Sequence, residues 1–82
     1  MTRNIERYRN YLFDLGLLLK EQAFEAKAER ETHRANSSES FYLGQLLAFH
    51  RVISLMQQQA TAFQIPLEDL QLKEIEPDKD LV

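Results

Sequence analysis

The chain contains no cysteine, which excludes disulfides and weakens the case for a structural metal. Only two glycines and two prolines occur in 82 residues, so few positions interrupt regular structure. Long apolar runs are also missing, because Asp14 and Lys20 divide the most hydrophobic part of the N-terminal half. We therefore expect neither a signal peptide nor a membrane-spanning segment, and we expect the protein to reside in the reducing cytoplasm.

The composition that remains is that of a small globular chain, with 44% hydrophobic and 28% charged residues. Eighty-two residues suffice for one domain with a modest core. Chains of this size usually gain stability from disulfides, metals or oligomerisation. Because disulfides are excluded, oligomerisation is the expected source.

Apolar side chains recur at helical spacing in both halves of the chain. In the first half they are Ile5, Tyr8, Leu12, Leu15, Leu19 and Ala26. In the second half they are Leu46, Phe49, Ile53, Met56, Ala60 and Phe63. Such stripes predict two long amphipathic helices. The expected fold is all-α: a long antiparallel helical hairpin with a short C-terminal helical turn.

Local signals predict the boundaries of these elements within a single helical domain, residues 1–75. Asn36 can cap a new helix, and Glu39 can return the hydrogen bond three residues later. Pro66 disfavours continuation of the second helix and can start a short turn. The prediction is a helix over about 4–34, a turn at 35–37, a helix over about 38–64 and a short turn at 66–70. Residues 76–82 carry charge, a proline and little to bury, so we expect an acidic flexible tail.

Each predicted helix carries a second apolar stripe that a two-helix hairpin cannot bury. On the first helix it consists of Phe13, Leu17 and Phe24; on the second, of Phe41, Ala48, Val52 and Leu55. A twofold contact between two copies would cover such surfaces without leaving an open edge. We expect these seven residues to form the interface of a homodimeric four-helix bundle.

Negative charge is concentrated from Glu68 to the end of the tail, because six acids and only two lysines follow Leu67. An antiparallel hairpin returns the end of the second helix to the start of the first, where Arg3, Arg7 and Arg9 lie. Three arginines near a helix N-terminus oppose the helix dipole. We expect the acidic tail to pair with them.

Few residues suggest chemistry, and we expect no catalytic, cofactor-binding or metal-binding residues. Glu25, Glu29 and His33 share one helical face, but their spacing is not that of the Glu-x-x-His pairs in di-iron bundles. His50 lies within the apolar second helix and could serve as a base or phosphoacceptor. It also lies roughly level with Glu25, so we expect a structural hydrogen bond between these two side chains and not a catalytic role.

Other binding functions are disfavoured by charge. The N-terminal arginines alternate with Tyr8 and Tyr11, as in some nucleic-acid sites, but the isoelectric point of about 5.3 opposes phosphate binding. The polar helix faces lack the lysine and arginine enrichment of membrane-surface helices. Gly16 and Gly44, each inside a predicted helix, indicate either close approach of another helix or tolerated variation.

The expected function is that of a small non-enzymatic interaction, adaptor or regulatory protein acting as a homodimeric helical bundle. The alternative is a subunit, antitoxin-like inhibitor or accessory factor that binds a different protein through its second apolar stripe. A metal-binding helical-bundle enzyme is the third interpretation. The sequence names no reaction and no partner.

Overall fold

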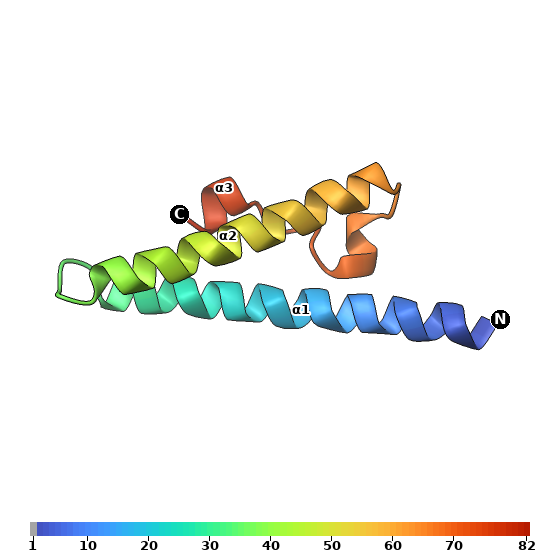
Figure 1. Ribbon diagram of the computed structural model, residues 1–82, viewed down its shortest axis with the longest axis horizontal. Coiled ribbons are helices and arrows are strands. Elements are labelled where there is room, and N and C mark those ends of the chain that lie inside the picture. Colours follow the sequence, from blue (N-terminus) through green and yellow to red (C-terminus); the bar gives the residue numbers. More distant parts are fainter. Residues whose placement is uncertain (1) are drawn as a thin grey trace.

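Two long helices form an antiparallel hairpin in the computed structural model, which describes residues 2–82 and the side chains from Asn4 onwards. Helix α1 spans Thr2–Thr32 and helix α2 spans Glu39–Ala62 (Figure 1). The molecule measures 53 × 21 × 16 Å. The predicted all-α helical hairpin is confirmed, and each long helix ends about two residues before its predicted C-terminal boundary.

The loop between the helices is closed by its own polar side chains. The Asn36 side-chain oxygen accepts a hydrogen bond from the Ser38 amide at 2.8 Å, and Glu39 Oε2 accepts one from the Ala35 amide at 2.7 Å. Ala35, in the loop three residues after the end of α1, adopts a positive φ of 67°. The Asn36–Glu39 signal therefore marks the turn as expected, although the Glu39 side chain accepts its hydrogen bond from the Ala35 amide and not from the Asn36 amide.

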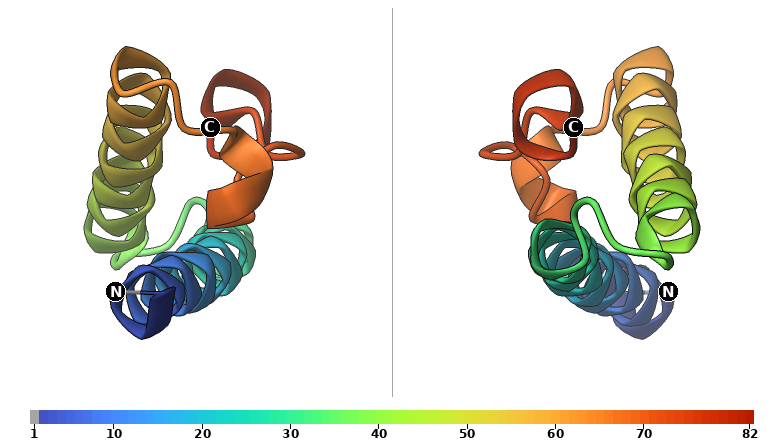
Figure 2. Two further views of the ribbon diagram at one scale, coloured as in Figure 1. Left: turned by 90° about the vertical axis from the view of Figure 1, so that its right-hand side faces the viewer. Right: turned by 90° about the vertical axis from the view of Figure 1, so that its left-hand side faces the viewer.

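The C-terminal segment, residues 67–82, forms a third side of the molecule. It contains a 3-10 turn, η1 (Leu67–Leu70), and a short helix, α3 (Pro77–Asp80). Viewed end-on, α1, α2 and this segment occupy the three corners of a triangle (Figure 2). The segment enters between the splayed ends of the hairpin and then runs back along α2 towards the loop (Figure 1).

The buried core lies inside this triangle and draws on all three sides. Its members from the long helices are Ala23, Leu46, Ile53 and Ala60, and those from the C-terminal segment are Leu70, Leu72, Ile75 and Leu81. Pro77 is buried as well. The expectation that residues 76–82 have little to bury is therefore wrong, because Leu81 is fully buried.

Gly16 allows the segment to pack directly on α1. A Cβ atom at this position would overlap the carbonyl oxygen of Leu70 and would lie 2.8 Å from its carbonyl carbon. The close approach expected for a glycine is present here, but it comes from the backbone of η1 and not from a helix. Gly44 has open space around it, with no atom within 4 Å of a Cβ placed there.

The residues of the predicted seams are buried or half-buried except where the hairpin opens. Ile5 and Tyr8 of α1 and Phe63 after α2 were expected in the core but are 59%, 68% and 71% exposed. Helix α1 is longer than α2, and η1 separates the two helices at this end (Figures 1 and 2). The N-terminal turns of α1 therefore have no helix opposite them.

Candidate interaction surface

The second apolar stripe of α2 lies on the surface. Phe41, Val52 and Leu55 are 68%, 42% and 56% exposed, and Ala48 between them is also exposed. The other sides of the helix have different neighbours. Ile53 faces the core, and His50 and Gln57 face the C-terminal segment. The stripe therefore points away from the C-terminal segment.

The second apolar stripe of α1 lies on the opposite side of the molecule. Phe13 shares a surface hollow with Lys20 and with Glu68 and Lys73 of the C-terminal segment. Helical geometry places Leu17 and Phe24 within about 40° of Phe13 around the axis. Leu17 is half-buried, whereas Phe24 is exposed. The seven predicted interface residues therefore do not form one continuous face.

Two α1 residues that the sequence prediction omitted lie beside the α2 stripe. Leu18 and Tyr11 are 50% and 63% exposed and lie across the buried seam of α1 from Phe13. Leu15 is half-buried and lies between these two residues and the core side of α1. The 3-4 spacing of Tyr8, Tyr11, Leu15 and Leu18 is the sequence signal that could have identified this stripe.

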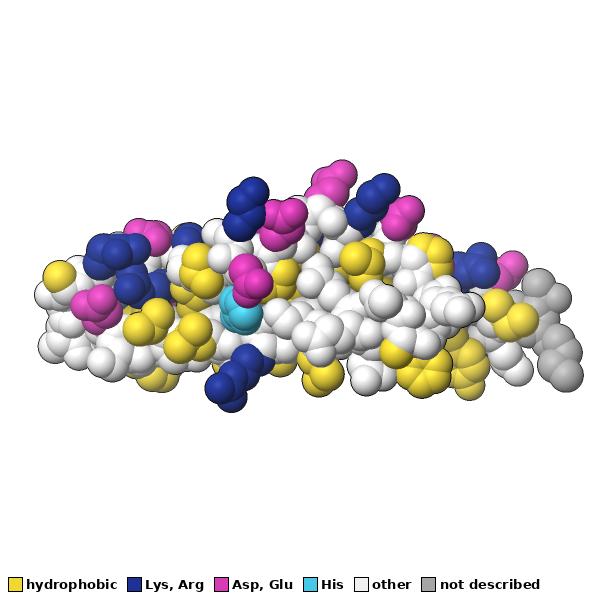
Figure 3. Space-filling model, turned by 90° about the horizontal axis from the view of Figure 1, so that it is seen from above, with side chains coloured by type: hydrophobic (Ala, Val, Ile, Leu, Met, Phe, Trp, Pro, Cys, Tyr) yellow, Lys and Arg dark blue, Asp and Glu magenta, His cyan; other side chains and the backbone are white. Residues whose placement is uncertain are grey.

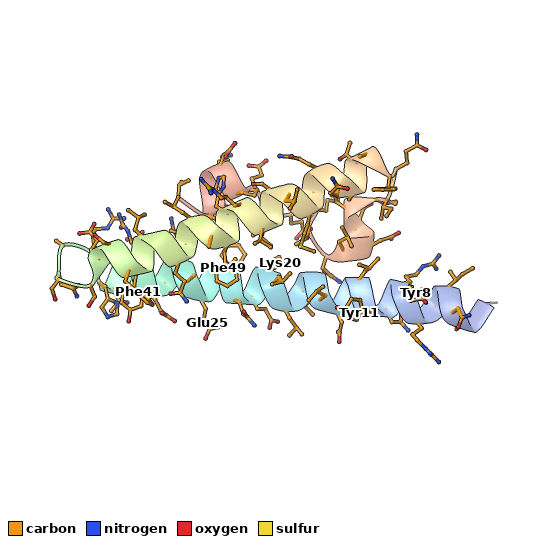
Figure 4. All side chains as sticks on the ribbon, viewed as in Figure 1. Tyr8, Tyr11, Lys20, Glu25, Phe41 and Phe49 are labelled. Carbon is orange, nitrogen blue, oxygen red and sulfur yellow. The ribbon has the colours of Figure 1, made fainter. Side chains whose placement is uncertain are left out.

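We call this side of the hairpin the bare face and define it by six residues: Tyr11, Leu18, Phe41, Ala48, Val52 and Leu55. Seen from above, charged side chains gather over the C-terminal segment along one edge, and hydrophobic side chains follow the opposite edge (Figure 3). Figure 4 shows Phe49 between the two long helices, and Tyr8 and Tyr11 on the N-terminal part of α1. The bare face thus exposes large apolar side chains from both long helices and is left uncovered by the C-terminal segment.

An apolar hollow adjoins this surface where the hairpin opens. It has a volume of about 200 Å³, and its lining residues are Leu12, Met56, Gln59, Ala60, Phe63, Ile65 and Leu70. Almost no polar atom faces it. Side chains from another molecule could therefore enter it without losing hydrogen bonds.

Polar contacts on the other side tie the C-terminal segment to the helices. Gln57 Nε2 donates hydrogen bonds to the carbonyl oxygens of Leu72 and Ile75, at 3.0 and 2.8 Å. His50 Nε2 lies 2.9 Å from Asp78 Oδ1, and Lys27 Nζ donates to the backbone oxygen of Val82. The predicted His50–Glu25 contact is wrong, because α3 supplies the carboxylate. His50 thus has a carboxylate partner on α3.

The prediction that the acidic tail pairs with the N-terminal arginines is also wrong. Asp78 and Val82 lie against the middle of the hairpin, near His50 and Lys27. The C-terminus is therefore remote from the N-terminal end of α1 (Figure 1). The side chain of Arg3 lies outside the described part of the chain, whereas Arg7 and Arg9 are exposed.

The three residues considered as metal ligands have other surroundings. His33 stacks on Tyr42 with ring centroids 3.9 Å apart, and its Nδ1 lies 2.8 Å from the carbonyl oxygen of Glu29. The side chains of Glu25 and Glu29 are exposed. Among the described residues, no group of three histidine or acidic side chains is arranged to hold a metal ion.

Charges near the loop form a surface network. Arg34 donates two hydrogen bonds to the Glu31 carboxylate, at 2.9 and 3.2 Å, and this holds the pKa of Glu31 below its usual value. Arg30 lies 3.4 Å from Glu39 across the hairpin. The Arg34–Glu31 pair is exposed and adds little to stability, whereas Arg30 and Glu39 are half-buried where they join the two helices.

Comparison of the chain with protein-family models, curated protein sequences and solved structures finds no match. Within residues 2–82, none of the helices combines the length and apolar character needed to cross a membrane.

Proposed function

We propose that this chain is a non-enzymatic interaction protein of the adaptor or regulatory kind, acting as a homodimeric helical bundle in the cytoplasm. The observation that carries the proposal is the bare face, where large apolar side chains of both long helices are exposed together. Soluble monomers rarely expose a contiguous apolar surface of more than a few hundred Å². A twofold contact would bury this face in both copies at once.

The division of the hairpin into two faces supports this proposal. One face is covered by the C-terminal segment, which contributes half of the core cluster. The bare face is the remaining side on which two helices lie next to each other. Pairing two bare faces would place four long helices together, with both C-terminal segments on the outside.

The test is sedimentation equilibrium over a wide concentration range, comparing the wild type with Leu55→Glu and Phe24→Glu. Both substitutions place a charge at an exposed apolar position, but only Leu55 belongs to the bare face. We expect the wild type and Phe24→Glu to be dimers and Leu55→Glu to be a folded monomer, with helical content checked by circular dichroism.

A wild-type protein that stays monomeric at all concentrations would contradict the homodimer. The same face would then be vacant for a different protein, as in the subunit, inhibitor or accessory-factor alternative. A pull-down with Leu55→Glu as the negative control would then follow. Dissociation by Phe24→Glu, but not by Leu55→Glu, would instead place the interface on the other side of α1.

A further inference from the structure

Contacts at both ends of the hairpin determine which residues of α1 and α2 are level with one another, that is, at the same position along the long axis of the hairpin. Near the loop, His33 stacks on Tyr42. Near the open end, Leu12 lines the same hollow as Met56 and Ala60. Between these points the antiparallel helices place Leu18 level with Val52 to Leu55, and Tyr11 level with Gln59.

The apolar part of the bare face is therefore unevenly distributed along α1. Tyr11 and Leu18 lie in the half of α1 towards the open end, whereas the same side of α1 near the loop carries Gln22, Glu25 and Glu29. On α2, Val52 and Leu55 lie level with the apolar half of α1, whereas Phe41 lies near the loop, beside the polar half of α1. If two copies make an apolar contact, Val52 and Leu55 of one copy must therefore be level with Tyr11 and Leu18 of the other.

We propose that the partner on the bare face is a second copy whose open end lies beside the first, with α1 of each copy packed on α2 of the other. This inference rests on the proposed function. A twofold axis parallel to the hairpin leaves each residue at the same position along that axis in both copies. It therefore places Leu18 on the partner's Val52. A central axis across the hairpin would instead reverse one copy and bring Tyr11 near the partner's glutamates.

The exposed area is sufficient for such a contact. Four aromatic residues border or belong to the bare face, namely Tyr8, Tyr11, Phe41 and Phe63, each 63–71% exposed. With aromatic side chains of about 200 Å², they expose roughly 500 Å² together. Adding Leu18, Val52 and Leu55 gives up to about 750 Å² per copy, close to the roughly 800 Å² per partner of a standard stable interface.

Charges at the edges of the bare face are complementary in this arrangement. Glu21 on α1 and Arg51 on α2 are exposed, lie at about the same level and form no ion pair among the described side chains. Packing α1 on the partner's α2 brings Glu21 of each copy towards Arg51 of the other. Both reciprocal pairs then flank the apolar contact.

Cysteine cross-linking tests the arrangement, and the cysteine-free chain provides a clean background. Leu18→Cys and Val52→Cys are prepared separately, allowed to exchange subunits and oxidised. We expect a covalent dimer in the mixture and little from either variant alone, because Leu18 faces the partner's Val52 and not its Leu18. Phe24→Cys mixed with Val52→Cys is the matched control and should not cross-link.

Sedimentation of the wild type separates failure of this arrangement from failure of the proposed function. If the protein is a dimer but Leu18→Cys cross-links by itself as well as the mixture does, the axis lies across the hairpin and the arrangement is wrong. A dimer in which neither this mixture nor Tyr11→Cys mixed with Gln59→Cys cross-links also overturns it. A monomeric wild type overturns both proposals.

Discussion

At the scale of single residues, the two glycines have opposite surroundings although both lie inside long helices. Gly16 is buried under the backbone of η1, and its missing side chain lets the carbonyl group of Leu70 rest on α1. Gly44 is exposed with nothing close to it. The helical penalty of glycine, about 1 kcal/mol relative to alanine, is therefore offset by packing only at position 16.

Gly16→Ala should lower the free energy of unfolding by roughly 1–3 kcal/mol, because the new methyl group forces η1 away from α1. Gly44→Ala is the matched control and should raise it by up to about 1 kcal/mol. Denaturant unfolding at one fixed protein concentration measures both. Equal effects of the two substitutions would show that η1 does not pack on α1 as described.

His50 illustrates what sequence reasoning could achieve for a single side chain. Its position in an apolar helix favoured a structural hydrogen bond to a carboxylate. Asp78 provides that carboxylate at 2.9 Å, and the predicted Glu25 does not. The partner depends on where the C-terminal segment lies, and no local spacing encodes this.

At the scale of elements, the C-terminal segment packs against both long helices and closes the third side of the core. Its apolar residues Leu70, Leu72, Ile75 and Leu81 occur at irregular intervals, so they match neither helical nor strand periodicity. The apolar character of Leu70, Leu72 and Ile75 predicts that they fold back over the open end of the hairpin, but periodicity does not show which surfaces they cover. The segment follows an irregular path, and Gln57 satisfies two of its carbonyl groups on the way.

Leu81→Ala should reduce the free energy of unfolding by about 2–5 kcal/mol, because it leaves a cavity in the core cluster. Val82→Ala, at the exposed neighbouring position, should change it by no more than about 0.5 kcal/mol. Thermal melts of the two variants, recorded at one protein concentration, provide the comparison. Two unchanged melting curves would mean that residues 76–82 do not contribute to the core.

At the scale of the whole molecule, the hairpin presents two unlike faces. One is covered by the protein's own C-terminal segment, and the other exposes Phe41, Val52, Leu55 and their neighbours on α1. This asymmetry explains why the two predicted surplus stripes separate. The α1 stripe with Phe13 borders the C-terminal segment, whereas the α2 stripe remains on the bare face.

Exchanging the charges at the edges of the bare face should reveal the proposed pairing. Glu21→Arg and Arg51→Glu should each weaken the dimer by roughly tenfold at low salt, because each converts two attractive pairs into repulsive ones. The double variant should regain most of the wild-type dissociation constant. Sedimentation equilibrium measures all four proteins; additive weakening in the double variant would contradict the Glu21–Arg51 pairing.

Periodicity and turn signals in the sequence were enough to predict the two long helices, their loop and most of the buried seam, including Leu46, Ile53 and Ala60. Helical periodicity and turn signals act between near neighbours, so they are readable without the fold. The tertiary structure alone decided the path of the C-terminal segment, the role of Gly16 and the choice of bare face. These depend on contacts between distant residues, and hydrophobic burial has no directional preference that would specify them locally.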